Sequence, residues 1–86
     1  MSISFSEVCE ILKTERNYQD RQGNNWDHKG TPSVEAELLL MEEYLQKART
    51  TWVTSPGNEQ TLDVLRKVIG VGVRCFENHG CPVRKN

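Results

Sequence analysis

Residues 34–52 read VEAELLLMEEYLQKARTTW, and the spacing of apolar side chains in this stretch decides the fold class. The apolar residues recur at steps of four and three, which is the spacing of a helix that buries one face: Val34, Leu38, Met41, Leu45, Ala48 and Trp52. A long helix over 33–52, with this stripe against the core, is therefore predicted. Two adjacent acids, Glu42 and Glu43, lie within it and raise the question of a metal site.

A first helix is predicted over 5–20, before this stretch. Ser4 and Glu7 have the spacing of a capping box, and apolar residues follow at helical spacing. Glycines, asparagines and a proline make 21–33 a loop.

A third helix is predicted over 56–78, and a tail over 80–86. Ser55 followed by Pro56 is typical of a helix N-terminus, and Gly80 of a helix C-terminus. The prediction is one all-α domain over 1–86, in which the last two helices form a long antiparallel hairpin.

The third helix has apolar residues around more than half of its circumference, whereas a surface helix needs an apolar arc of only about 100°. Burial on two sides is expected, and in so short a chain the second side is assigned to another subunit. The glycines in this helix support this assignment, because their missing side chains permit close approach of another backbone. Each glycine lowers helix propensity by up to ~1 kcal/mol relative to alanine, and this cost suggests that packing is the reason for its presence. The predicted interface of a homo-oligomer consists of Val64, Val68, Gly70, Val71, Gly72 and Cys75.

Composition narrows the class of protein. The chain has 86 residues, with eleven Lys and Arg against twelve Asp and Glu, so nucleic acid is not the expected partner. The three cysteines, Cys9, Cys75 and Cys81, lack metal-ligand spacing and are too few for a disulfide scaffold, so reduced thiols and a cytoplasmic location are expected. We expect no signal peptide at the N-terminus and no membrane partner, because the apolar runs are short.

Three segments carry a resemblance to a known family: ERNYQD at 15–20, the loop with Trp26 and His28, and MEEYLQKA at 41–48. Together they resemble the MazG-like all-α nucleotide pyrophosphohydrolases. The whole chain is similar to small phage-encoded members of that group, whose last helix ends in a sequence like RCFENHG at 74–80. For a phage-encoded protein, the expected location is the host cytoplasm.

The resemblance implies a magnesium site that this chain carries only in part. In the family, EExxE on one helix and ExxD on the next supply carboxylates for Mg²⁺, an ion that prefers oxygen ligands. Glu42 and Glu43 match the first two acids, but Gln46 stands at the third. On the next helix Asp63 replaces the glutamate, and Arg66 replaces the aspartate. The candidate metal and catalytic residues are therefore Glu42, Glu43 and Asp63. Arg66 either pairs with Glu42 or Asp63 as a structural contact, or holds a phosphate.

A nucleotide site is the second candidate. Its residues combine cations for phosphate, an aromatic ring for a base and polar amides: Arg16, Gln19, Trp26, Lys29, Gln46 and Arg66. Trp26 alternatively fills the core between the first two helices, His28 is alternatively an exposed loop residue, and the charged strip of the third helix is alternatively an ordinary surface.

Two functions remain open on the sequence. One is a non-catalytic MazG-like protein that binds a nucleotide or inhibits a host protein, for example one of antiviral defence. It requires no cofactor. The alternative is a nucleoside triphosphate pyrophosphohydrolase that requires Mg²⁺.

Overall fold

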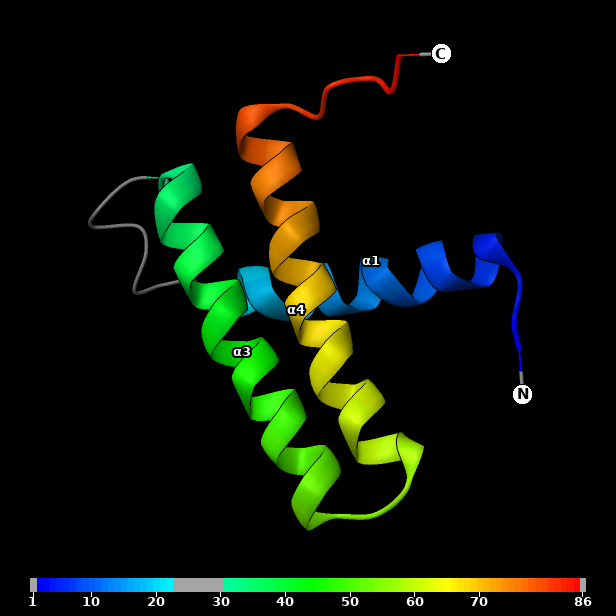
Figure 1. Ribbon diagram of the computed structural model, residues 1–86. Helices are drawn as coiled ribbons and strands as arrows, with labels where there is room; N and C mark the ends of the chain where they lie inside the picture. The colour runs from blue at the N-terminus through cyan, green and yellow to red at the C-terminus, as the bar shows by residue number, and fades with distance from the viewer. Residues whose placement is uncertain (1, 23–30, 86) are drawn as a thin grey trace.

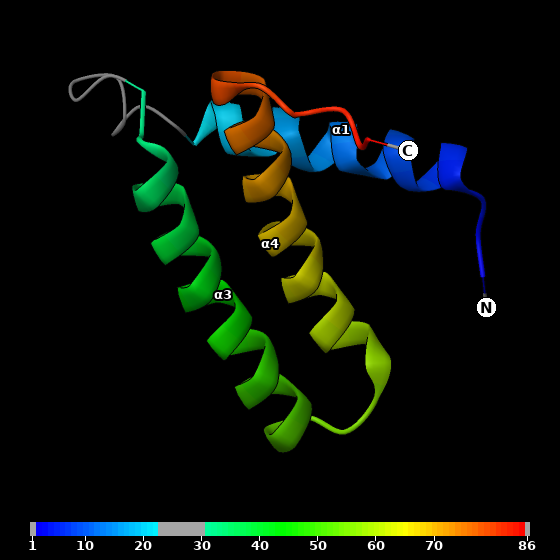
Figure 2. The same cartoon turned by 45° about the horizontal axis from the view of Figure 1, so that its top comes forward.

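The computed structural model describes residues 2–22 and 31–85, and three helices account for most of them. They are α1 (Phe5–Arg21), α3 (Val34–Thr54) and α4 (Asn58–His79). Figures 1 and 2 show α3 and α4 side by side, with the chain running along one and returning along the other, and α1 crossing α4 at a steep angle. The N-terminal half of α1 projects beyond the other two helices. The all-helical prediction is confirmed for the described part of the chain.

Local side-chain contacts explain where the first two helices begin. At α1 the predicted capping box is present: Ser4 Oγ accepts from the Glu7 amide at 3.1 Å, and Glu7 Oε1 accepts from the Ser4 amide at 3.1 Å. At α3, Ser33 Oγ accepts from the Ala36 amide at 3.1 Å.

The turn between α3 and α4 differs from the prediction. Ser55 ends α3, its amide donating to the Thr51 carbonyl at 2.8 Å, and α4 begins at Asn58 with Gly57 as its N-cap. Gly57 has φ 116°, a conformation that glycine adopts without strain. Gly80 ends α4 as predicted, with φ 95° and its amide donating to the Phe76 carbonyl at 2.8 Å.

The core between α3 and α4 is small. The buried apolar residues of the described part are Ala48, Val64, Val68 and Val71. The face of α3 toward this core is rotated from the predicted stripe, because Met41 and Ala48 face inward whereas Leu38, Leu45 and Trp52 are about half exposed. The stripe at 34–52 therefore divides between a buried edge and a solvent-facing edge.

Helix α1 packs on α4 through a face that changes character along its length. The least exposed residues follow helical spacing and are apolar first and polar later: Cys9, Leu12, Glu15, Arg16 and Gln19. None of the helices described is both long enough and apolar enough to cross a membrane.

Candidate functional site at the crossing of α1 and α4

Gly70 is the point at which α1 crosses α4. A Cβ atom at this position would lie 2.7 Å from Gln19 Nε2 and 2.8 Å from Glu15 Cγ, so only glycine leaves room for α1. Gly72, two residues later, is less restricted, because a Cβ atom there would meet Met41 Cε at 3.4 Å, an ordinary contact. The approach predicted at Gly70 was that of another subunit's backbone, whereas in the structure the side chains of Glu15 and Gln19 on α1 of the same chain lie against it.

On one side of the crossing, Arg66 joins two carboxylates. Its Nε donates to Glu15 Oε1 at 2.8 Å, and its NH2 group lies 2.7 Å from Asp63 Oδ1. Gln19 Nε2 donates to Glu15 Oε2 at 3.2 Å and to the Lys67 carbonyl at 3.4 Å. The hydrogen bond to Glu15 raises the pKa of Arg66 above its ordinary value against the effect of burial, with a further contribution from Asp63. Arg66 is therefore charged, and two of its nitrogen atoms face carboxylates.

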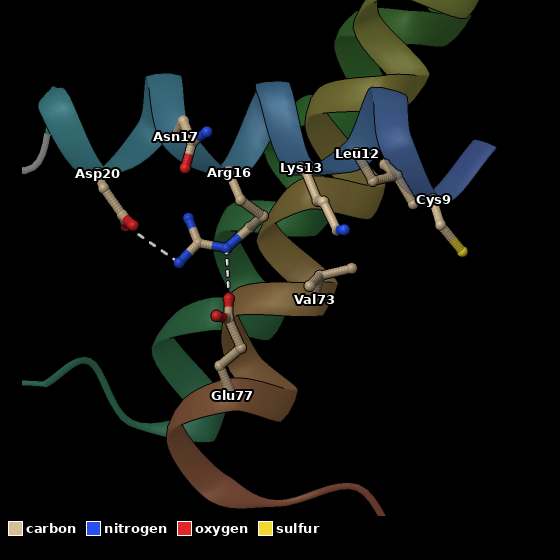
Figure 3. Close-up of a pocket in the computed structure, with 8 residues that line it drawn as sticks. All are labelled: Cys9, Leu12, Lys13, Arg16, Asn17, Asp20, Val73 and Glu77. Atoms are coloured by element: carbon tan, nitrogen blue, oxygen red, sulfur yellow. Dashed lines mark hydrogen bonds and ion pairs between the residues drawn. The ribbon is translucent and has the colours of Figure 1, made fainter. Parts of the chain in front are cut away.

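On the other side, Arg16 has a matching role, shown in Figure 3. Its guanidinium donates to Glu77 Oε1 at 2.5 Å, lies 3.0 Å from Asp20 Oδ1, and donates to Gln19 Oε1 at 3.2 Å. Burial alone would lower the pKa of Arg16, but the hydrogen bonds to Glu77 and Asp20 outweigh it, so the pKa is raised above the ordinary value. Gln19 links this cluster to that of Arg66.

A hollow of about 330 Å³ lies beside Arg16, between α1 and the C-terminal half of α4. Cys9, Leu12 and Val73 form its apolar part, and Lys13 and Asn17 reach it from α1 (Figure 3). The Lys13 ammonium lies 3.1 Å from Glu10 and is mostly exposed. Both basic groups at this hollow therefore already have a carboxylate neighbour.

A third arginine joins α4 to α3. Arg74 donates from Nε to Glu37 Oε2 at 2.8 Å and from NH2 to Glu37 Oε1 at 2.6 Å, a two-point contact. The Glu37 side chain is 1% exposed. Nearby, His79 Nε2 lies 2.8 Å from the Pro32 carbonyl, so the end of α4 is also held to the residues that precede α3.

The predicted metal residues do not form one site. Glu42 and Glu43 are exposed on α3, whereas Asp63 lies against Arg66 on α4. Within residues 2–22 and 31–85, no three His, Cys, Asp or Glu side chains are placed to hold a metal ion together. The expected pairing of Arg66 with Asp63 is present, but Glu15 takes the place expected for Glu42.

The predicted nucleotide residues are brought together in part. Arg16, Gln19 and Arg66 meet around Gly70, whereas Gln46 is an exposed residue of α3. Trp26, His28 and Lys29 lie outside the described residues.

The predicted oligomer interface lies mostly inside the single chain. Val64, Val68 and Val71 are buried, as is Gly70, while Gly72 and Cys75 are partly exposed. The wide apolar surface of α4 is explained by α3 on one side and α1 on another. The apolar residues of α4 that remain exposed are Leu62, Ile69 and Phe76.

Glu15 and Glu37 are the buried acids of the described residues, and neither was among the predicted site residues. The available signal was a set of three arginines, Arg16, Arg66 and Arg74, on helices expected to pack together, because a buried cation needs an acid nearby.

Comparisons with protein-family models, with curated proteins and with solved structures found no match to this chain.

Proposed function

We propose that this chain is a non-catalytic MazG-like protein that acts by binding another protein. One observation carries the proposal: the arginines at the site where a nucleotide or metal was expected are held by carboxylates of the same chain. Arg16 is held by Asp20 and Glu77, and Arg66 by Glu15 and Asp63.

This arrangement disfavours phosphate as the ligand. A guanidinium recognises phosphate through two parallel N–H donors, and here the Nε donor of each arginine already serves a carboxylate. A phosphate bound by either arginine would lie beside these acids, and at such distances two negative charges repel strongly. The four acids around Arg16 and Arg66 outnumber the two guanidiniums.

Exposed apolar side chains favour a protein as the ligand. Leu38 and Leu39, next to each other on α3, are 54% and 63% exposed. Neighbouring apolar groups left in solvent mark protein interaction sites more often than isolated ones do. The resemblance to small phage-encoded proteins adds the proposal that the partner is a host protein.

Two measurements test the proposal. Calorimetric titration with nucleoside triphosphates, with and without Mg²⁺, is expected to give no binding, and incubation is expected to give no pyrophosphate. Pyrophosphate release that is lost in Glu42→Gln would establish the pyrophosphohydrolase instead. Binding without Mg²⁺ that is lost in Arg16→Gln would make the ligand a nucleotide.

A capture experiment tests the protein partner directly. Tagged wild-type chain is expected to retain a specific protein from a bacterial lysate, and Leu39→Glu is expected to lose it. Val83→Glu, in the exposed tail, is the control. If Leu39→Glu and wild type retain the same proteins, the assignment of a partner to this part of α3 is refuted.

A further inference from the structure

Two apolar hollows on this molecule share one lining residue. The first lies between α1 and the N-terminal half of α4, where Val8, Ile11, Leu62 and Ile69 line it. The second lies between α3 and α4 near their connecting turn, where Leu45 and Trp52 line it. Leu65 lines both hollows. We call this surface the corner face: Val8, Ile11, Leu45, Trp52, Leu62, Leu65 and Ile69.

We propose that the corner face binds a second copy of this chain. The proposal goes beyond the function above, because it uses a different surface and a different partner.

The accessible surface area of the single chain is large for its mass, which favours a partner that is always present. The accessible area is 7004 Å², whereas a compact monomer of this mass would have roughly 5200 Å². The tail at 81–85 contributes to the excess of about 1800 Å², and the corner face is an apolar contribution to it. Subunits of obligate oligomers bury about 1000 Å² or more each, so such an interface would remove more than half of this excess.

The small core favours a second copy over a foreign partner. Four apolar residues are buried in the described part, and α1 leaves most of its apolar side chains in solvent. A chain of 86 residues has little stability to spare. A second copy is present wherever the chain is made, whereas a foreign partner would leave these side chains exposed before it binds.

The spacing and charges of the corner face suit helices of the same kind. Leu45 and Trp52 are seven residues apart, as are Leu62 and Ile69, and seven-residue spacing aligns apolar side chains along a helix–helix seam. The first hollow is bordered by Glu59, Asp63 and Arg66, and the second by Arg49. In a two-fold dimer each face meets its own copy, so a face that carries both charges can pair acid with base. The expected assembly is a helical bundle in which α3 and α4 of both copies pack together.

Sedimentation velocity across a range of protein concentrations tests the proposal. Wild type is expected to sediment as a dimer or a larger oligomer. Leu62→Glu places a charge on the corner face and is expected to give monomer, with the dissociation constant raised at least about a hundredfold. Leu39→Glu is the matched control, because Leu39 is an equally exposed leucine outside both hollows. It is expected to keep the wild-type assembly.

A second variant distinguishes loss of assembly from loss of folding. Leu62→Ala keeps helix propensity and adds no charge, and it is expected to raise the dissociation constant about tenfold while the helical circular dichroism is retained. Monomeric wild type at all concentrations would overturn the proposal. So would unchanged assembly of folded Leu62→Ala, or dissociation of Leu39→Glu to the same extent. The calorimetric and capture tests of the proposed function do not depend on any of these results.

Discussion

Gly70 offers the sharpest test of the crossing between α1 and α4. In the variant Gly70→Ala, the new Cβ atom would lie 2.7 Å from Gln19 Nε2 and 2.8 Å from Glu15 Cγ. Gln19 can move its amide, since that atom is at the end of a flexible side chain. Glu15 is more restricted, because Cγ lies in the middle of a buried side chain whose carboxylate binds Arg66.

Two opposing effects set the size of the change. Alanine in a helix interior is more favourable than glycine by about 1 kcal/mol. Overpacking a well-filled contact costs about 1–3 kcal/mol, and a weaker hydrogen bond between Arg66 and Glu15 adds about 1 kcal/mol. We expect Gly70→Ala to lower the free energy of unfolding by about 1–3 kcal/mol. Gly72→Ala is the matched control, because its Cβ atom meets only Met41 at an ordinary distance. It is expected to be stabilising by about 0.5–1 kcal/mol.

Urea unfolding followed by circular dichroism measures both variants, at one protein concentration so that assembly does not change the comparison. The opposite signs are the decisive result. If Gly70→Ala is as stabilising as Gly72→Ala, then α1 does not lie on α4 at Gly70, and the clusters around Arg16 and Arg66 are misplaced.

Two further predictions use the same measurement. Arg74→Met removes the two-point contact of the buried Glu37 carboxylate and should lower the free energy of unfolding by about 3–5 kcal/mol. Arg84→Met in the exposed tail is the control and should leave the free energy of unfolding unchanged. Equal effects of the two substitutions would refute the contact. Ser4→Ala removes the N-cap of α1 and should cost about 1 kcal/mol, with Ser2→Ala as a neutral control, and an unchanged Ser4→Ala would contradict the capping box.

The range of each interaction along the chain explains which features were predictable. The capping box at Ser4 and the end of α4 at Gly80 depend on neighbours within four residues, and the sequence predicts both. The prediction of Ser55 as the start of the third helix was wrong, because serine is also compatible with the end of a helix and α3 continues to Thr54. Whether Ser55 ends α3 or begins α4 depends on the packing of α3 on α4.

The two acidic partners of Arg66 lie at very different distances along the chain. Its partner Asp63 is three residues away on the same helix, so spacing alone predicts the pair. Its partner Glu15 is 51 residues away, and the two meet only because α1 crosses α4 at Gly70. The sequence predicted a close approach at Gly70, but a missing side chain does not identify the element that takes the space.

The contacts of α1 connect the charged clusters to the corner face. Along its C-terminal half, α1 is held to α4 by Arg66, which pairs with the buried Glu15, and by Arg16, which pairs with the half-exposed Glu77. A partly exposed pair such as Arg16 with Glu77 contributes little, about 0–1 kcal/mol. Along its N-terminal half, Val8 and Ile11 are 39% and 44% exposed, so part of each side chain is still open to a second copy. Helix α1 contributes none of the buried apolar residues of the described part, so it would gain apolar burial if a second copy covered the corner face. We therefore expect dimerisation to stabilise the crossing, because the helix that carries Glu15, Arg16 and Gln19 also carries part of the corner face.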